Sequence, residues 1–293
     1  MTNSLLKLIA IITMLIDHIG AYLFYSGSNL VSIQTIDIMR AIGRMALPIF
    51  AFFLVVGYKK TRDNKKYISR MHLFAIISQI PFTLAFYYEN YNVFENISFI
   101  EYDSKNLIFI IPMIAFYYLF ILNRKFDTSL IYVSIAWLIT PINMAYNGYF
   151  LLTGYELNIF YELGLGLILF EYFNLIKTKY KKKISIDAII AIASILSYYY
   201  IGQLANYGYD AIALMIALYI TKESKYHQAF IVAIWGYYMY NWSITNVLFV
   251  LLSAILLLTY NGKKGANLKY IFYTFYPIHI IILAIFNLFN ILQ

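Results

Sequence analysis

Residues 5–25, LLKLIAIITMLIDHIGAYLFY, form an apolar stretch that only Lys7, Asp17 and His18 interrupt with ionisable side chains. A transmembrane α-helix needs ~20 predominantly apolar residues, because the hydrocarbon core offers the backbone no water. The stretch contains charge and lacks a small-residue cleavage site, so a cleaved signal peptide is not expected. We therefore predict that it is the first membrane-spanning helix.

The whole chain has the same apolar character. Of its 293 residues, 62% are hydrophobic and 12% are charged, and the mean hydropathy is +0.69. Soluble domains average about 45–50% apolar and about 25% charged residues. This composition excludes an ordinary soluble enzyme and a disordered chain, and it predicts a multi-pass protein of the cytoplasmic membrane in contact with the lipid bilayer. The absence of cysteine excludes disulfide scaffolds and a cysteine nucleophile.

The apolar stretches predict an all-α, polytopic bundle of about eleven transmembrane helices, with nine or ten left open because several are short. We take residues 1–293 as a single transmembrane domain. The eleven stretches are residues 5–25, 41–58, 67–88, 107–122, 129–145, 158–177, 186–204, 208–221, 227–241, 244–260 and 270–290.

The basic residues predict a cytoplasmic N-terminus. With that orientation, 19 of the 22 lysines and arginines fall in cytoplasmic segments, as the positive-inside rule requires. The outward connection 89–106 carries four acidic residues against one lysine. The net charge of +8 thus reflects membrane topology, and no nucleic-acid partner is expected.

Ionisable side chains inside the predicted helices are functional candidates, because lipid tolerates them only where they face protein or water. Asp17 and His18 are neighbours on one helix and point about 100° apart, so they cannot share one contact. Either residue serves the chemistry or holds a neighbouring helix. A histidine near a carboxylate suits general-base catalysis.

Arg40 and Arg44 are expected at the outer end of the second span, on one helix face. They would pair with Asp17 or hold an anion, or else reach the lipid headgroups. His279 lies in the last predicted helix with Tyr276 and Pro277 close by, where a cavity wall is plausible. His72 and His227 are expected at the membrane interface, and the four scattered histidines give no metal-site spacing.

Four further polar residues are binding-site candidates. Asn158 and Glu162 are four residues apart and share one helix face. Gln79 precedes Pro81 in the third span, and Asp210 begins the eighth, where helix capping explains it equally well.

Several blocks in order resemble the TraX family of membrane proteins and cover residues 5–285. The blocks are LKLIAIITMLIDHIGAYLF, GRMALPIFAFFLVVGYKKTRDNKKYISR, ISQIPFTLAF, LNIFYELGLGLILFEYF, LANYGYDAIALMIALYI and YNGKKGANLKYIFYTFYPIHIIIL. The family's namesake is associated with N-terminal acetylation of pilin, and the family looks like a branch of the transmembrane acyltransferase superfamily. The resemblance marks Asp17, His18, Arg44, Gln79, Asn158 and His279. Asn206 stands where the family pattern has aspartate, and Asp210 lies a helical turn away.

The resemblance implies an acyltransferase that moves an acetyl group from cytoplasmic acetyl-CoA, as co-substrate and without a metal, to an extracytoplasmic acceptor. The acceptor would be a peptide N-terminal amine or a cell-surface glycan hydroxyl, and a lipid headgroup also stays open. In this hypothesis His18 is the general base or transient acetyl carrier, oriented by Asp17 or by Gln79 and Asn158, and Arg44 or His279 stabilises the carbonyl oxygen. The alternatives are a transporter or flippase with a midplane polar site and a non-catalytic assembly protein.

Overall fold

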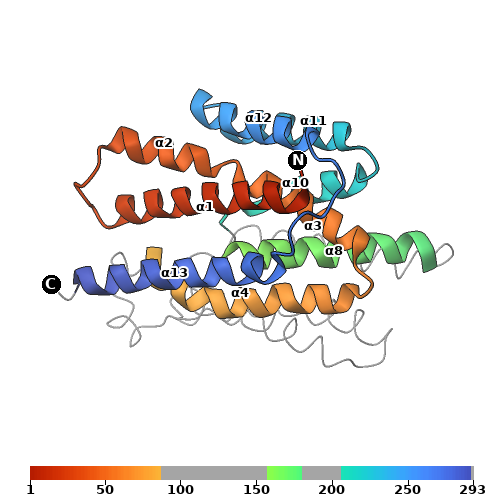
Figure 1. Ribbon diagram of the computed structural model, residues 1–293, viewed down its shortest axis with the longest axis horizontal. Coiled ribbons are helices and arrows are strands. Elements are labelled where there is room, and N and C mark those ends of the chain that lie inside the picture. Colours follow the sequence, from red (N-terminus) through yellow and green to blue (C-terminus); the bar gives the residue numbers. More distant parts are fainter. Residues whose placement is uncertain (87–156, 180–205, 292–293) are drawn as a thin grey trace, which may run out of the picture. The chain divides into compact units, whose positions relative to one another are not determined.

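The computed structural model describes residues 1–86, 157–179 and 206–291. These residues are organised as α-helices, which confirms the all-α prediction. The helices are α1 (Asn3–Tyr25), α2 (Ile33–Gly43), α3 (Ala46–Lys60), α4 (Asn64–Phe86), α8 (Ile159–Lys179), α10 (Gly208–Ile220), α11 (Lys225–Tyr240), α12 (Ile244–Leu258) and α13 (Lys269–Ile291) (Figure 1).

The chain divides into two compact units, which are described separately. Unit 1 consists of Met1–Lys59, Leu84–Glu89 and Ala213–Gln293, and unit 2 of Lys60–Thr83 and Asn90–Ile212. Within unit 1, α1 packs against α2 on one side and α13 on another, and α12 packs against α11 and α2. The prediction of one domain over residues 1–293 stays a prediction.

The second span differs from the sequence-based expectation of a helix over 41–58. It begins at Ile33, where the Ser32 side chain caps α2 by accepting a hydrogen bond from the Thr35 N–H, at 3.3 Å. The helix breaks at Arg44, which is the C-cap of α2, and α3 continues from Ala46. Pro48 lies in the first turn of α3, where its missing N–H is tolerated.

Arg40 and Arg44 therefore do not lie at the end of a helix that starts at 41 but within a bent element that runs over Ile33–Lys60. The polar residues between 33 and 40 concealed the first part of the helix from a hydropathy reading.

In unit 2, α4 and α8 run antiparallel and meet at three levels. Near one end Gln79 contacts Asn158, further along the His72 ring lies against Gly164, and the Asn64 amide donates to Glu171 Oε2 at 3.2 Å. A β-carbon at Gly164 would lie 2.7 Å from His72 Cε1, so only glycine permits this approach. His72 is 1% exposed, so its ring is enclosed by protein.

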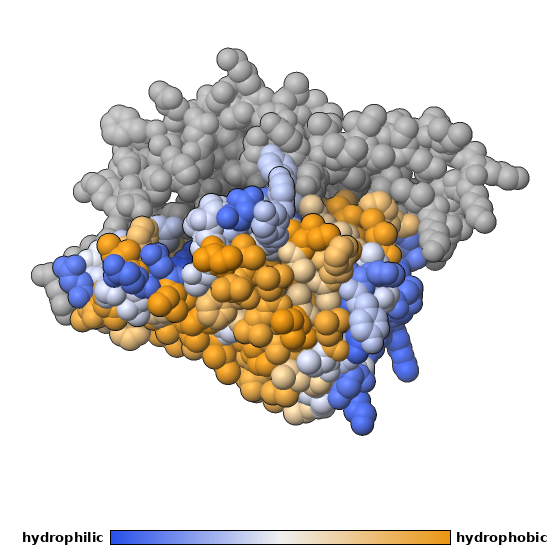
Figure 2. Space-filling view, turned by 90° about the horizontal axis from the view of Figure 1, so that it is seen from above, coloured by the Kyte–Doolittle hydropathy of each residue, from blue (hydrophilic) through white to orange (hydrophobic). Residues whose placement is uncertain are grey.

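Four elements are long and apolar enough to cross a membrane: α1, the bent α2–α3 element, α4 and residues Tyr270–Phe289 of α13. The apolar helices α10 and α12 are shorter. Counting α2 and α3 as one element gives eight helices in the described residues, so eleven spans are not supported. Three predicted spans (107–122, 129–145 and 186–204) and the connection 89–106 lie outside the described residues. Figure 2 shows a broad hydrophobic face with hydrophilic residues towards its ends, as expected of a membrane protein.

The first residues of the chain are tied to the segment before α13. The Met1 ammonium donates to the Thr259 carbonyl, the Asn3 N–H donates to the Lys263 carbonyl at 2.9 Å, and the Ser4 N–H donates to the Lys264 carbonyl at 3.2 Å. Gly265 has φ +70°, and a β-carbon there would overlap Ser4 Oγ. The start of α1 and the start of α13 therefore lie at the same end of unit 1.

Candidate active site

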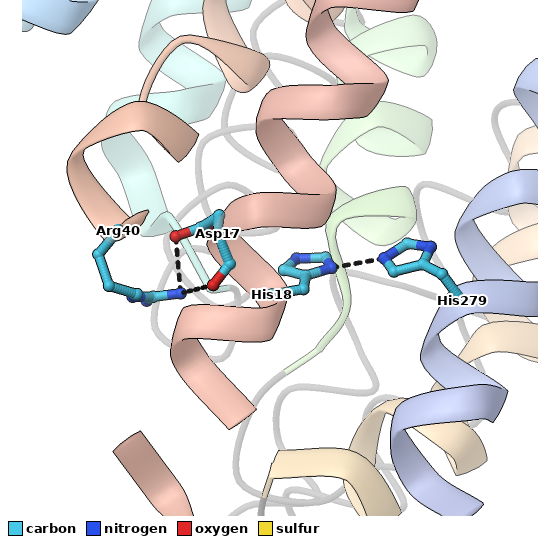
Figure 3. Close-up of polar contacts among 4 residues, drawn as sticks. All are labelled: Asp17, His18, Arg40 and His279. Atoms are coloured by element: carbon cyan, nitrogen blue, oxygen red, sulfur yellow. Dashed lines mark hydrogen bonds and ion pairs between the residues drawn. The ribbon is translucent and has the colours of Figure 1, made fainter. Parts of the chain in front are cut away.

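Asp17 faces α2. Its Oδ1 lies 2.8 Å from Arg40 Nη1, and the same nitrogen donates to the Asp17 backbone carbonyl at 3.3 Å (Figure 3). A β-carbon at Gly43 would overlap the side chain of Asp17, so glycine is required where the carboxylate meets α2. The Asp17 side chain is 6% exposed and that of Arg40 is 31% exposed. This ion pair therefore joins α1 to α2 in a largely buried position.

His18 points away from Asp17, towards α13 (Figure 3). Its Nδ1 lies 2.6 Å from His279 Nε2, and the two ring planes are inclined by 15°. The other nitrogen of His279, Nδ1, lies 2.7 Å from the Phe275 carbonyl oxygen, four residues earlier in α13. Two histidines that are 261 residues apart in the sequence thus form a linear hydrogen-bonded chain that ends at a backbone carbonyl.

The carbonyl at the end of this chain fixes the proton positions for neutral rings. A carbonyl oxygen only accepts, so His279 carries its proton on Nδ1 and its Nε2 is an acceptor. His18 must then donate from Nδ1, which leaves the lone pair on His18 Nε2. No described residue hydrogen-bonds to that Nε2. His18 is half-buried, and the contact of its Nδ1 with His279 fixes the direction of the unprotonated nitrogen.

Aromatic rings surround the histidine pair. Tyr276 lies edge-on to His18 with 5.8 Å between ring centroids, and Phe86 does the same at 5.6 Å. Phe275 stacks on His279 at 4.7 Å. These contacts restrict the rotation of both imidazoles and give the pair an apolar border. Tyr276, predicted beside His279, is thus placed at the pair and is 4% exposed.

Arg44 packs against an aromatic ring of α11. Its guanidinium carbon lies 5.6 Å from the centroid of the Tyr240 ring, in cation–π geometry. Both ring nitrogens of His279 are engaged, so the neutral ring has no N–H left for a substrate carbonyl. The geometry assigns His279 the orientation of His18, a role that the sequence analysis gave to Asp17 or to Gln79 and Asn158.

The candidates of unit 2 form a second network. Asn158 Nδ2 donates to Gln79 Oε1 at 2.7 Å and to the Ala75 carbonyl at 2.8 Å, and its Oδ1 accepts from the Phe160 N–H at 3.1 Å. Glu162 Oε1 accepts from the Tyr207 N–H at 2.8 Å, just before α10 begins. Asn158 and Glu162 are fully buried. The two bonds that Asn158 Nδ2 donates hold α4 to the start of α8, which suits a structural role.

Asp210 lies in the first turn of α10, as predicted. Three groups that contact the candidate residues of unit 1 were not predicted from the sequence: the Phe275 carbonyl, Phe86 and Tyr240. The contact with the Phe275 carbonyl could have been predicted, because that carbonyl lies four residues before His279 in one helix. Phe86 and Tyr240 had none, because their places follow from packing between segments far apart in the sequence.

Comparison with known proteins supports the resemblance noted in the sequence. A probable fimbrial assembly protein FimC (serogroup H1) of Dichelobacter nodosus is 42% identical over 77 residues, which are 26% of this chain and 29% of that protein. An uncharacterized protein, RP591, of Rickettsia prowazekii (strain Madrid E) is 40% identical over 84 residues, 29% of this chain and 28% of that protein. Each match therefore spans less than a third of the relative. No solved structure matches the chain significantly.

The family comparison covers far more of the chain than the individual relatives do. The TraX protein family matches residues 2–165 and 130–287, two overlapping regions that include α1 with His18 and α13 with His279. This chain belongs to the TraX family.

Proposed function

We propose that this protein is an integral membrane acetyltransferase that uses His18 Nε2 as a general base. The observation that carries the proposal is the chain His18–His279–Phe275 carbonyl, which leaves an oriented, unprotonated nitrogen on a membrane-spanning helix. If His18 only formed an ion pair or capped a helix, it would not need a second histidine to fix its tautomer. Imidazole held in one tautomer by a partner is the usual form of a catalytic histidine base.

In the proposed reaction His18 Nε2 takes the proton from an acceptor amine or hydroxyl as the acceptor attacks the thioester carbonyl. A C–N or C–O bond forms, the C–S bond breaks, and the leaving thiolate receives the proton from His18. His279 accepts the His18 Nδ1–H throughout and shares the positive charge while His18 is protonated. His18 is therefore neutral again after each turnover.

The donor in this proposal is acetyl-CoA and the acceptor lies on the extracytoplasmic side. The FimC relative carries a fimbrial assembly name, and the resemblance of the chain points to pilin acetylation, so a pilin-type peptide amine is the first acceptor to test. A cell-surface glycan hydroxyl is the second. We assign Arg44, whose guanidinium lies over the Tyr240 ring, to acceptor binding.

The proposal includes a topology with the N-terminus in the cytoplasm and an odd number of spans. The chain start is hydrogen-bonded to residues 259–264, so these two segments must lie on the same side of the membrane. An even number of crossings then separates them, and α13 adds one more. Of the nine to eleven spans expected from the sequence, nine or eleven agree with this contact and ten does not. The basic residues of the connections favour the cytoplasm for this side.

The test uses purified protein in lipid nanodiscs with radiolabelled acetyl-CoA and either a pilin N-terminal peptide or a surface-glycan fragment. The expected result is label on one acceptor with wild-type protein and no label with His18→Ala. An unfolding temperature equal to that of wild type shows that the variant is folded. Full transfer by folded His18→Ala overturns the assignment. Uptake of a solute into liposomes without acetyl-CoA would favour a transporter instead.

A further inference from the structure

Lys7 is an ionisable residue on a membrane-spanning helix that the proposed chemistry does not use. Its Nζ lies 5.3 Å from the centroid of the Phe53 ring on α3 and 5.2 Å from that of the Phe272 ring on α13. Among the described residues no carboxylate pairs with it. Two aromatic faces hold this ammonium in place, and within residues 1–86, 157–179 and 206–291 no anion neutralises its charge.

Other lysines at the ends of the unit 1 helices have evident structural roles. Lys225 Nζ donates to the Leu258 and Tyr260 carbonyls at 2.8 Å and 3.3 Å and so closes the end of α12. Lys59 Nζ pairs with Glu223 at 2.6 Å. Lys7 closes no helix end, and the first N–H groups of α1 are already bonded to the chain before α13. Its position therefore suits the binding of an external anion.

Lys7 and His18 lie on one face of α1. Their positions differ by eleven residues, which is just over three turns, about 16 Å along the axis. Both contact α13, because Lys7 meets Phe272 and His18 meets His279. The seam between α1 and α13 thus carries an oriented cation at one end and an oriented base further along.

The spacing matches the dimensions of a CoA thioester. Thirteen covalent bonds join the sulfur of CoA to its first phosphorus, and an extended chain of that many bonds spans about 15 Å at peptide bond geometry. We propose that the Lys7 ammonium, held between Phe53 and Phe272, binds the diphosphate of the acyl-CoA whose thioester meets His18. This inference rests on the proposed function and adds a phosphate-binding residue to it.

The experiment measures equilibrium binding of radiolabelled CoA, which cannot turn over, to protein in nanodiscs of zwitterionic lipid. Lys7→Met removes the charge and keeps a flexible apolar chain against both rings, so folding should be retained. We expect its Kd for CoA to rise about tenfold. Lys7→Arg should bind as wild type, because it keeps the charge and the aromatic contacts. Lys222→Met is the matched control, since Lys222 lies 3.8 Å over a single ring, that of Tyr219.

Pantetheine, which lacks the phosphates, serves as the second probe, and its binding should not change in Lys7→Met. Unchanged CoA binding by Lys7→Met overturns the Lys7 inference and leaves the proposed function standing. No CoA binding by wild type overturns the proposed function itself. If Lys7 instead holds a lipid phosphate, Lys7→Met loses bound anionic lipid in native mass spectra while its CoA affinity stays the same. If Lys7→Met does not fold, Lys7→Gln takes its place in every comparison.

Discussion

His18 Nδ1 and His279 Nε2 lie 2.6 Å apart, and the Phe275 carbonyl at the far side of His279 decides which of them holds the proton. Replacing His279 by leucine removes the acceptor and frees His18 to turn or to adopt the other tautomer. We expect acetyl transfer by His279→Leu to fall about 100-fold in kcat, with little change in KM for the acceptor. Steady-state kinetics on the nanodisc protein measure both values.

His279→Gln separates orientation from charge sharing. The glutamine oxygen accepts the His18 Nδ1–H but cannot take up a proton, so this variant should keep more activity than leucine if orientation is the main role. The exposed His227 gives the matched control, and His227→Leu should behave as wild type. Equal activity of the leucine variant and wild type would remove His279 from the mechanism.

The Asp17–Arg40 pair predicts a stability effect that is independent of chemistry. Asp17→Ala leaves the Arg40 charge partly buried without its carboxylate and should lower the free energy of unfolding by about 3 kcal/mol. The double variant with Arg40→Ala should recover part of the loss, because no unpaired charge remains. Thermal unfolding in detergent compares these variants with Asp37→Ala, which removes an exposed carboxylate from α2. Additive losses in the double variant would contradict a coupled pair.

Much of unit 1 could be read from the sequence, and the part that could not depends on packing. Hydropathy located α1 and α13, and the cost of charge in lipid singled out Asp17, His18 and His279. The direction of each side chain needed the neighbouring helices. Asp17 turns to α2 because Gly43 leaves room for it, and a pattern in one helix does not reveal that room.

The start of α2 was missed for a different reason. A hydropathy window rewards apolar runs, whereas residues 33–40 mix isoleucine with glutamine, threonine and aspartate on an amphipathic helix. The Ser32 cap was the available signal. Placing the helix start at 41 put Arg40 and Arg44 at a helix end, whereas they lie within the element Ile33–Lys60.

Asn158 provides a charge test of the network in unit 2. Its Nδ2 donates to two oxygens, Gln79 Oε1 and the Ala75 carbonyl, so Asn158→Asp places a carboxylate oxygen against two acceptors. We expect a larger loss of stability than in Asn158→Ala, and a partial recovery as the pH is lowered, because a protonated carboxyl donates again. Unfolding temperatures measured from neutral to acidic pH report both the loss and the recovery. Asn174→Asp, on an exposed part of α8, adds the same charge as a control and should show no such recovery.

The contact between the chain start and residues 259–264 predicts a topology that labelling can test. The chain contains no cysteine, so single cysteines report without background. Cysteine at Ser28, between α1 and α2, should react with a membrane-impermeant maleimide in intact cells, whereas cysteine at Asn261 should react only after the cells are opened. Cysteine at Thr2 should behave like Asn261, since the two segments are hydrogen-bonded together. Opposite accessibility of Thr2 and Asn261 would contradict the odd number of spans, and equal accessibility of both from outside would reverse the orientation.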